Sequence, residues 1–279
     1  MSRPFTVVKV LNNNVIIAEA ENAAEVIVIG KGIGFGKKRG DTIANDQVDK
    51  LFLLANQQEQ EEYKQLLSDV DETLVATVHD ALQIVRKRLD QPLNERVHIA
   101  LTDHLSFAIR RLENGIDIEN PFLQETELLY PEEFALARDV VDLVNQTMAT
   151  SLPEGEIGFV ALHIHSAISN RSLSEIRSHS ELLTALVSLI EEKLDLRIEP
   201  NSITYSRLVS HLQQVIERAL KGEVTEGNER LIQVLKDDYP LCYNLSWQLI
   251  KIIQKQLKLP VAEAEAVYLT LHLQRLSSK

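Results

Sequence analysis

The chain has 279 residues, of which 44% are hydrophobic and 25% are charged, and its formal net charge is −12. This composition is typical of globular proteins and excludes wholesale disorder, and a length of this size predicts two or three compact units. The single cysteine, Cys242, excludes an internal disulfide framework and favours a reducing cytoplasm. Because no apolar run of about 18 residues and no signal-peptide core are found, we expect neither membrane insertion nor secretion.

Charge is distributed unevenly along the chain. Residues 1–40 hold six basic side chains against three acidic ones, within a chain that is strongly acidic overall. Phosphate contacts need clustered lysine and arginine side chains. Any anionic partner is therefore expected at the amino-terminal end.

The first sixty residues have the pattern of short β-strands. FTVVKVL at 5–11, NVIIA at 14–18 and EVIVI at 25–29 are rich in β-branched residues, and KLFLL at 50–54 could supply a fourth strand. The asparagines at 12–14 suit a turn between the first two strands. So small an antiparallel sheet buries little core alone, so we expect it to form a dimer.

The pattern becomes helical after the sheet. A polar, helix-like stretch begins near residue 57, and a second weak boundary falls at 170–178. We therefore expect a multidomain chain with a small β-sheet domain at 1–58 and two all-α helical-bundle domains at 59–171 and 172–279.

The two helical domains are related by an internal repeat. LTDHLSFAIRRLENG at 101–115 aligns without a gap with LVSHLQQVIERALKG at 208–222, and EIGFVALH at 156–163 aligns with EAVYLTLH at 265–272. Such self-similarity is the signature of duplicated structural units. The two domains are therefore expected to be homologous.

A glycine-rich segment, GKGIGFGKKRG at 30–40, follows the third strand. Its spacing matches neither the Walker loop nor the dinucleotide-binding fingerprint. It instead combines Phe35 with four cations, and aromatic stacking with flanking cations is a common way to bind unpaired RNA bases. The alternative is a hairpin loop in which Phe35 packs on the sheet and the cations are solvated. The cations are Lys31, Lys37, Lys38 and Arg39.

Four of the eight histidines occupy equivalent positions in the repeat: His104 with His211, and His163 with His272. A lone histidine on an apolar helix face is usually a packing residue, but its recurrence favours a function. No zinc-binding motif and no convincing nucleophile accompany these histidines, so we predict no metal site, no cofactor and no catalytic residue. Imidazole is partly neutral and nucleophilic near neutral pH, which suits a phosphoryl acceptor.

These segments resemble a known family. VVKVLNNNVIIA followed by VIGKGIGFGKK is similar to the co-antiterminator RNA-binding domain, and LTDHLSFAIRR, SRLVSHL and EAVYLTLHLQRL resemble the regulation domains of the phosphotransferase system (PTS). The whole chain resembles a BglG/SacY-type transcriptional antiterminator, and its motifs are most similar to those of the subgroup that serves the glucose permease operon.

The resemblance implies a mechanism, partners and site residues. A dimer of the sheet domain would bind a hairpin in the leader mRNA of a sugar-uptake operon and prevent terminator formation. The implied RNA contacts are Lys9, Asn14, Gly30, Lys31 and Phe35.

Phosphorylation of the two regulation domains would set the activity. The resemblance implies that the sugar-specific permease (EII) acts on the first domain and the phosphocarrier protein HPr mainly on the second, in the cytoplasm. The implied phosphorylation sites are His104, His163, His211 and His272.

Two alternatives belong to other classes of protein. The histidines could relay phosphate to sugar, which would make the chain a phosphoryl-transfer component of the PTS rather than a non-enzymatic regulator. The same regulation domains also occur in DNA-binding activators, but no helix-turn-helix segment precedes them in this sequence.

Overall fold

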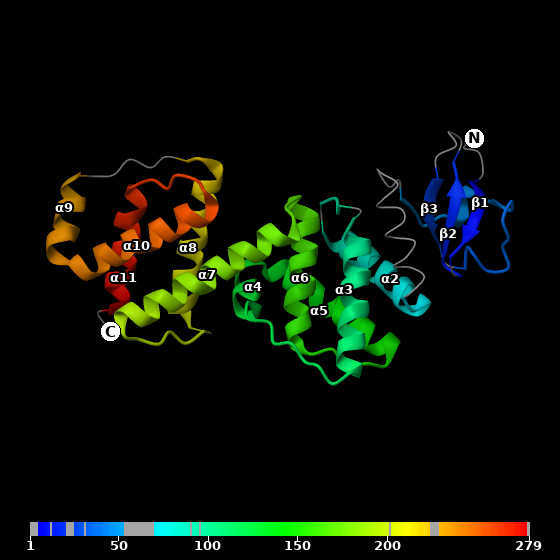
Figure 1. The fold of residues 1–279 in the computed structure, drawn as a ribbon, viewed down its shortest axis with the longest axis horizontal. Helices are drawn as coiled ribbons and strands as arrows, with labels where there is room; N and C mark the ends of the chain where they lie inside the picture. The colour runs from blue at the N-terminus through cyan, green and yellow to red at the C-terminus, as the bar shows by residue number, and fades with distance from the viewer. Residues whose placement is uncertain are drawn as a thin grey trace. The chain divides into compact units, whose positions relative to one another are not determined.

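The structure is a computed structural model that describes residues 5–11, 13–20, 25–30, 32–52, 70–89, 91–94, 96–200, 202–223 and 229–277. Strands come first and helices follow, as the sequence predicts (Figure 1). By its internal contacts the chain divides into two compact units, one of residues 1–120 with 132–171 and the other of residues 121–131 with 172–279.

The amino-terminal sheet has five antiparallel strands in the order β4-β1-β2-β3-β5. The three predicted strands and the start of the fourth are confirmed; residues 53 and 54 lie outside the described part. The short strand β4, which pairs with β1, was missed because two residues carry no readable periodicity. The strands are β1 Phe5–Val10, β2 Val15–Glu19, β3 Glu25–Ile29, β4 Thr42–Ile43 and β5 Lys50–Phe52.

β2 is the central strand and is buried on both faces. Ile16 and Ala18 point to one face, where they pack with Val7, Val28 and others in an aliphatic cluster. On the opposite face Ile17 is only 2% exposed. A strand covered on both sides reads as a continuous apolar run, which explains the sequence VIIA.

Among the described residues, four helices of the first unit follow the sheet. Their apolar positions recur three or four residues apart and are buried, for example Leu101, Leu105 and Ala108 on one face of α3. α3 packs against both α2 and α6. The helices are α2 Glu72–Arg88, α3 Arg96–Glu113, α5 Pro131–Met148 and α6 Glu154–Ser169.

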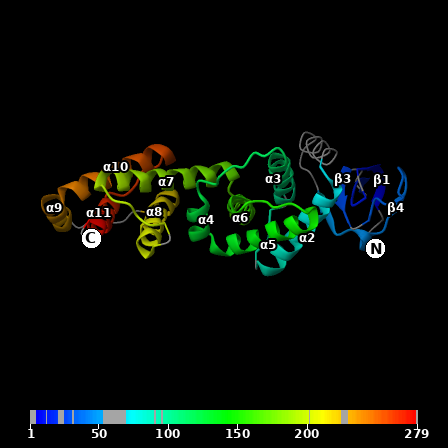
Figure 2. The same cartoon turned by 90° about the horizontal axis from the view of Figure 1, so that it is seen from below.

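The second unit contains the other helices among the described residues, and Figure 2 shows α7 and α10 side by side within it. Its large aliphatic core includes Leu186, Leu212 and Leu249, each fully buried. The helices are α4 Leu123–Leu129, α7 Leu173–Leu194, α8 Ile203–Lys221, α9 Glu229–Asp238, α10 Pro240–Leu257 and α11 Ala264–Ser277.

The two copies of the repeat agree in local conformation. Gly115 and Gly222, which follow the equivalent helices α3 and α8, have φ angles of +72° and +67°. Tyr130 and Tyr239, which precede the prolines that begin α5 and α10, share φ and ψ to within a few degrees. These matches support the homology that the sequence predicts.

One element of the first copy folds with the second unit. α4 packs against α7 and α8, and buried Glu125 accepts hydrogen bonds from the Tyr205 hydroxyl at 2.6 Å and the Thr184 hydroxyl at 3.2 Å.

None of the helices that the structure describes combines the length and the hydropathy that a membrane-spanning helix needs.

We expect Gly30→Ala to destabilise the sheet by about 1 to 3 kcal/mol. A Cβ at residue 30 would lie 2.3 Å from the backbone oxygen of Gln47, which cannot move without distorting the loop. Gly32→Ala is the control, because its Cβ would meet nothing within 4 Å and only its φ of +67° costs about 1 kcal/mol. Hydrogen exchange of the β2 and β3 amides in the full chain measures the difference; equal protection in the two variants would contradict the packing argument.

Candidate functional site

The glycine-rich loop is fastened to the asparagine turn by three hydrogen bonds. The amide of Gly30 donates to the carbonyl oxygen of Asn14 at 3.0 Å, and the amide of Gly34 donates to that of Asn13 at 2.9 Å. The amide of Gly32 donates to the side-chain oxygen of Asn14 at 2.8 Å. Asn14 therefore holds the loop through both its backbone carbonyl and its side-chain oxygen.

Phe35 stands out from this loop. Its side chain is 76% exposed, so the alternative in which it packs on the sheet is wrong. Lys38 and Arg39, three and four residues further along the chain, are exposed as well. An exposed aromatic ring with flanking cations is a surface on which an unpaired base can stack.

The other predicted contact residues differ in their surroundings. Lys9 is exposed on β1, directly opposite Ile17, just past a register shift between Val7 and Lys9. Gly30 is buried, and its amide and carbonyl are both used within the protein. Lys31 lies outside the described residues.

The first histidine cluster consists of His104, His163, Glu156 and Arg111. α3 supplies His104 and Arg111, and α6 supplies Glu156 and His163; each pair is seven residues, or two turns, apart and so shares one helix face. The centres of the two imidazole rings lie 5.0 Å apart. Glu156, whose side chain is fully buried, contacts His104 Nε2 at 2.8 Å through one oxygen and pairs with Arg111 through the other.

The second histidine cluster consists of His211, His272, Glu265 and Arg218, on α8 and α11. Its two rings are closer, with centres 3.4 Å apart. Glu265 is buried and accepts two hydrogen bonds of 2.6 Å from the guanidinium of Arg218. Both oxygens of this carboxylate therefore hold the arginine, whereas Glu156 divides its oxygens between arginine and histidine.

The surroundings lower the pKa of three of the four imidazoles and so favour their neutral form. Burial, aided by His104, lowers the pKa of His163 to about 3. Burial together with Arg218 and Arg207 lowers the pKa of His211, and burial together with His211 and Arg275 lowers that of His272. A neutral imidazole keeps a free lone pair, which a nucleophile requires.

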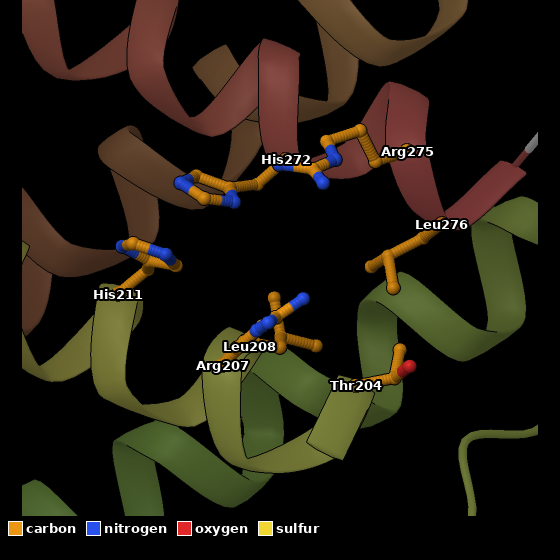
Figure 3. Close-up of a pocket in the computed structure, with 7 residues that line it drawn as sticks. All are labelled: Thr204, Arg207, Leu208, His211, His272, Arg275 and Leu276. Atoms are coloured by element: carbon orange, nitrogen blue, oxygen red, sulfur yellow. The ribbon is translucent and has the colours of Figure 1, made fainter. Parts of the chain in front are cut away.

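A cavity of about 300 Å³ borders the second histidine cluster. Figure 3 shows the two imidazoles and two further guanidiniums around it. The lining residues are Thr204, Arg207, Leu208, His211, His272, Arg275 and Leu276.

Comparisons with known proteins cover both kinds of site. The CAT RNA binding domain matches residues 5–61, and the PRD domain matches residues 79–167 and 184–276. The PtsGHI operon antiterminator of Bacillus subtilis (strain 168) is 52% identical over all of this chain and 99% of its own length. The GlcA/glcB genes antiterminator of Staphylococcus carnosus (strain TM300) is 40% identical over 96% of this chain and 94% of its own.

The crystal structure of GlcT CAT-PRDI is similar as well. It shares 53% sequence identity and a TM-score of 0.56, and the match covers 60% of this chain and all of that one. The chain belongs to the BglG/SacY family of antiterminators. Its fold of one CAT sheet followed by two PRDs is the one that the sequence predicts.

The fold of this antiterminator brings together each histidine pair that the repeat singles out. Sequence reasoning missed that Arg111 and Arg218 are already paired with buried carboxylates, although Glu156 and Glu265 recur at equivalent places and were visible in the alignment. The sequence does not show which helices pack together, and an arginine on one helix can reach a glutamate on another only when the two helices are in contact.

The other histidines lie outside both clusters. His98 is 1% exposed and its ring centre lies 6.0 Å from that of His79. His165 contacts Glu133 at 2.9 Å. Among the described residues of both PRDs, no three histidine, cysteine or acidic side chains are placed to hold a metal ion.

We expect Glu156→Ala to lower the free energy of unfolding by about 3 to 5 kcal/mol, because it leaves the guanidinium of Arg111 largely buried without its partner. The control is Glu154→Ala on the same helix, whose side chain is 67% exposed and which should change stability by less than about 0.5 kcal/mol. Urea unfolding of the full chain, followed by circular dichroism, measures both. Similar losses in the two variants would contradict the buried pair as the cause.

We expect stability to fall with pH below about 6.5. His98 and His163 have a pKa of about 3 in the folded protein, against 6.5 as the ordinary value, and burial is the main cause in each. Between these values the unfolded chain binds more protons, so the free energy of unfolding drops by about 1.4 kcal/mol per pH unit for each histidine.

Urea unfolding between about pH 6.5 and about pH 5 measures this slope, because there the carboxylates remain largely ionised. His163→Leu should reduce the slope by the share of one histidine, about 1.4 kcal/mol per pH unit. A slope that His163→Leu leaves unchanged would show that His163 titrates normally in the folded chain.

Proposed function

We propose that this antiterminator binds a hairpin in the leader mRNA of an operon for glucose uptake through the PTS, prevents formation of the overlapping terminator, and is controlled by phosphorylation of its PRD histidines. The observation that carries the RNA half is the exposed ring of Phe35, followed in the chain by exposed Lys38 and Arg39, on a loop fastened to Asn14. The operon is inferred from relatives whose names refer to ptsGHI and to glcA/glcB.

The proposed RNA surface comprises Lys9, Asn14, Lys31 and Phe35, with Gly30 permitting the close approach of the loop to its neighbours. Lysine side chains would pair with phosphates, and Phe35 would stack on an unpaired base. The active form would be a dimer of the CAT sheet, in the cytoplasm. We assign the CAT domain to residues 1–58 and the PRDs to 59–171 and 172–279.

The histidine clusters support control by phosphoryl transfer. A neutral imidazole nitrogen would attack the phosphorus of a phosphohistidine donor; the donor's N–P bond breaks as the new N–P bond forms, and the acceptor's ring proton passes to the donor imidazole. We assign His104 and His163 to the permease (EII) and His211 and His272 to HPr. The added group carries close to two negative charges and would compete with Glu156 for Arg111, or with Glu265 for Arg218.

We expect Phe35→Ala to weaken binding of the leader hairpin by about 1 to 3 kcal/mol through lost stacking, with the fold retained. Gel shifts with the hairpin and with duplex DNA measure this and also test for a DNA-binding activator. Phe107→Ala is the matched control, because Phe107 is 61% exposed on a PRD helix. Tight binding to duplex DNA alone, or equal hairpin affinity of the two variants, would overturn the RNA surface.

We expect His104→Asp to reduce transcriptional read-through about fivefold or more, the range of an ordinary coupling free energy. The new carboxylate would lie beside Glu156, compete for Arg111 and imitate part of the phosphoryl charge. His104→Asn is the control, since it changes size similarly without adding charge. A reporter with the leader placed upstream measures read-through, and sedimentation measures the dimer; equal effects of both substitutions would point to altered packing instead.

A phosphoryl-transfer component would behave differently. Incubation of the chain with HPr, its phosphodonor and labelled glucose separates the two functions. Labelling that stops at the number of acceptor histidines supports regulation, whereas sustained production of sugar phosphate would overturn it.

A further inference from the structure

The second histidine cluster has a feature that the first lacks. Arg207 on α8 and Arg275 on α11 border the same cavity as His211 and His272 (Figure 3). The volume of about 300 Å³ is enough for a small anion together with some of its water. Two guanidiniums and two imidazoles from two helices therefore surround one opening.

Neither of these arginines is neutralised within the described part of the chain. Arg218 nearby gives its hydrogen bonds to Glu265, but no carboxylate or other acceptor among the described residues takes one from Arg207 or Arg275. Both side chains are exposed. Their positive charges contribute to the lowered pKa of the imidazoles, Arg207 to that of His211 and Arg275 to that of His272. The described residues that line the cavity thus carry positive charge and include no acidic side chain.

The repeat shows that this charge is specific to the second copy. The positions equivalent to Arg207 and Arg275 are Ala100 and Ser166. In the first copy His104 also contacts Glu156, whereas in the second neither His211 nor His272 is hydrogen-bonded to another described residue. The framework of histidines, glutamate and arginine is shared, and the two extra cations are not.

We propose that Arg207 and Arg275 form an anion clamp that holds a phosphoryl dianion over the His211–His272 pair, and that the first PRD has no such clamp. A guanidinium presents paired N–H donors that match two phosphate oxygens, and charge-assisted bonds of this kind are among the strong ones. The dianion has two possible sources: a phosphoryl group carried on one of the imidazoles, which rests on the proposed function, or free inorganic phosphate, which does not.

The first experiment titrates the full chain with inorganic phosphate in a calorimeter, at constant ionic strength. The double variant Arg207→Gln/Arg275→Gln should bind at least about tenfold more weakly, the equivalent of one charge-assisted bond. The control is Lys251→Gln/Lys255→Gln, which removes the same charge from exposed positions of α10 and should bind as the unaltered chain does. Equal weakening in both variants, or no phosphate binding by the unaltered chain, would overturn the clamp.

The second experiment distinguishes the two sources. The full chain is phosphorylated by HPr and its phosphodonor, and the labelled peptides are identified by mass spectrometry. A tenfold slower labelling of His211 and His272 in the Arg207→Gln/Arg275→Gln variant, with His104 and His163 unaffected, assigns the clamp to the covalent group. Unchanged labelling alongside weaker phosphate binding assigns it to free phosphate.

The outcomes for the clamp and for the proposed function are separate. If no histidine of the unaltered chain accepts a phosphoryl group, control by phosphorylation fails, yet the phosphate titration still decides whether the clamp exists. Equal melting temperatures of the unaltered chain and both double variants would establish that the comparison is made on folded protein.

Discussion

Each PRD depends on a buried carboxylate that grips an arginine from the neighbouring helix. Glu156 and Glu265 are almost fully enclosed, and a carboxylate so placed is tolerated only because a guanidinium and further donors satisfy it. The pairing fixes the rotation of α3 against α6 and of α8 against α11. Since the histidines lie two turns away on the same faces, the ion pair also helps to bring the two imidazoles of each copy together, with ring centres 5.0 Å apart in the first copy and 3.4 Å in the second.

The two copies differ in what surrounds their histidines. In the first copy the carboxylate divides its oxygens between histidine and arginine, so that added negative charge on His104 would disturb the ion pair directly. In the second copy the arginine occupies both oxygens, and the imidazoles face a cavity bordered by other cations. The two copies therefore share the buried ion pair but differ in a charged group that lies beside the histidines. In the first copy it is the carboxylate of Glu156, and in the second it is a pair of arginines at the cavity.

Much of this could be predicted from the sequence, and the rest follows from contacts that a linear pattern does not encode. The repeat identified His104, His163, His211 and His272, because equivalent residues recur at fixed offsets. It could not show whether Phe35 packs or projects, since both conformations use the same glycine-rich loop. Partners on separate helices, such as Arg218 and Glu265, and the two-residue strand β4 become visible only when the chain is folded.

The position of α4 has a consequence for how the two PRDs are linked. The sequence repeat counts α4 as part of the first copy, yet Glu125 accepts bonds from Tyr205 and Thr184, and Leu128 and Leu129 pack on the core of the second unit. The second unit therefore contains a helix that the sequence repeat assigns to the first copy. Cleavage of the chain after residue 171 would leave both sequence copies intact, but it would separate α4 from the second unit, whose core it covers.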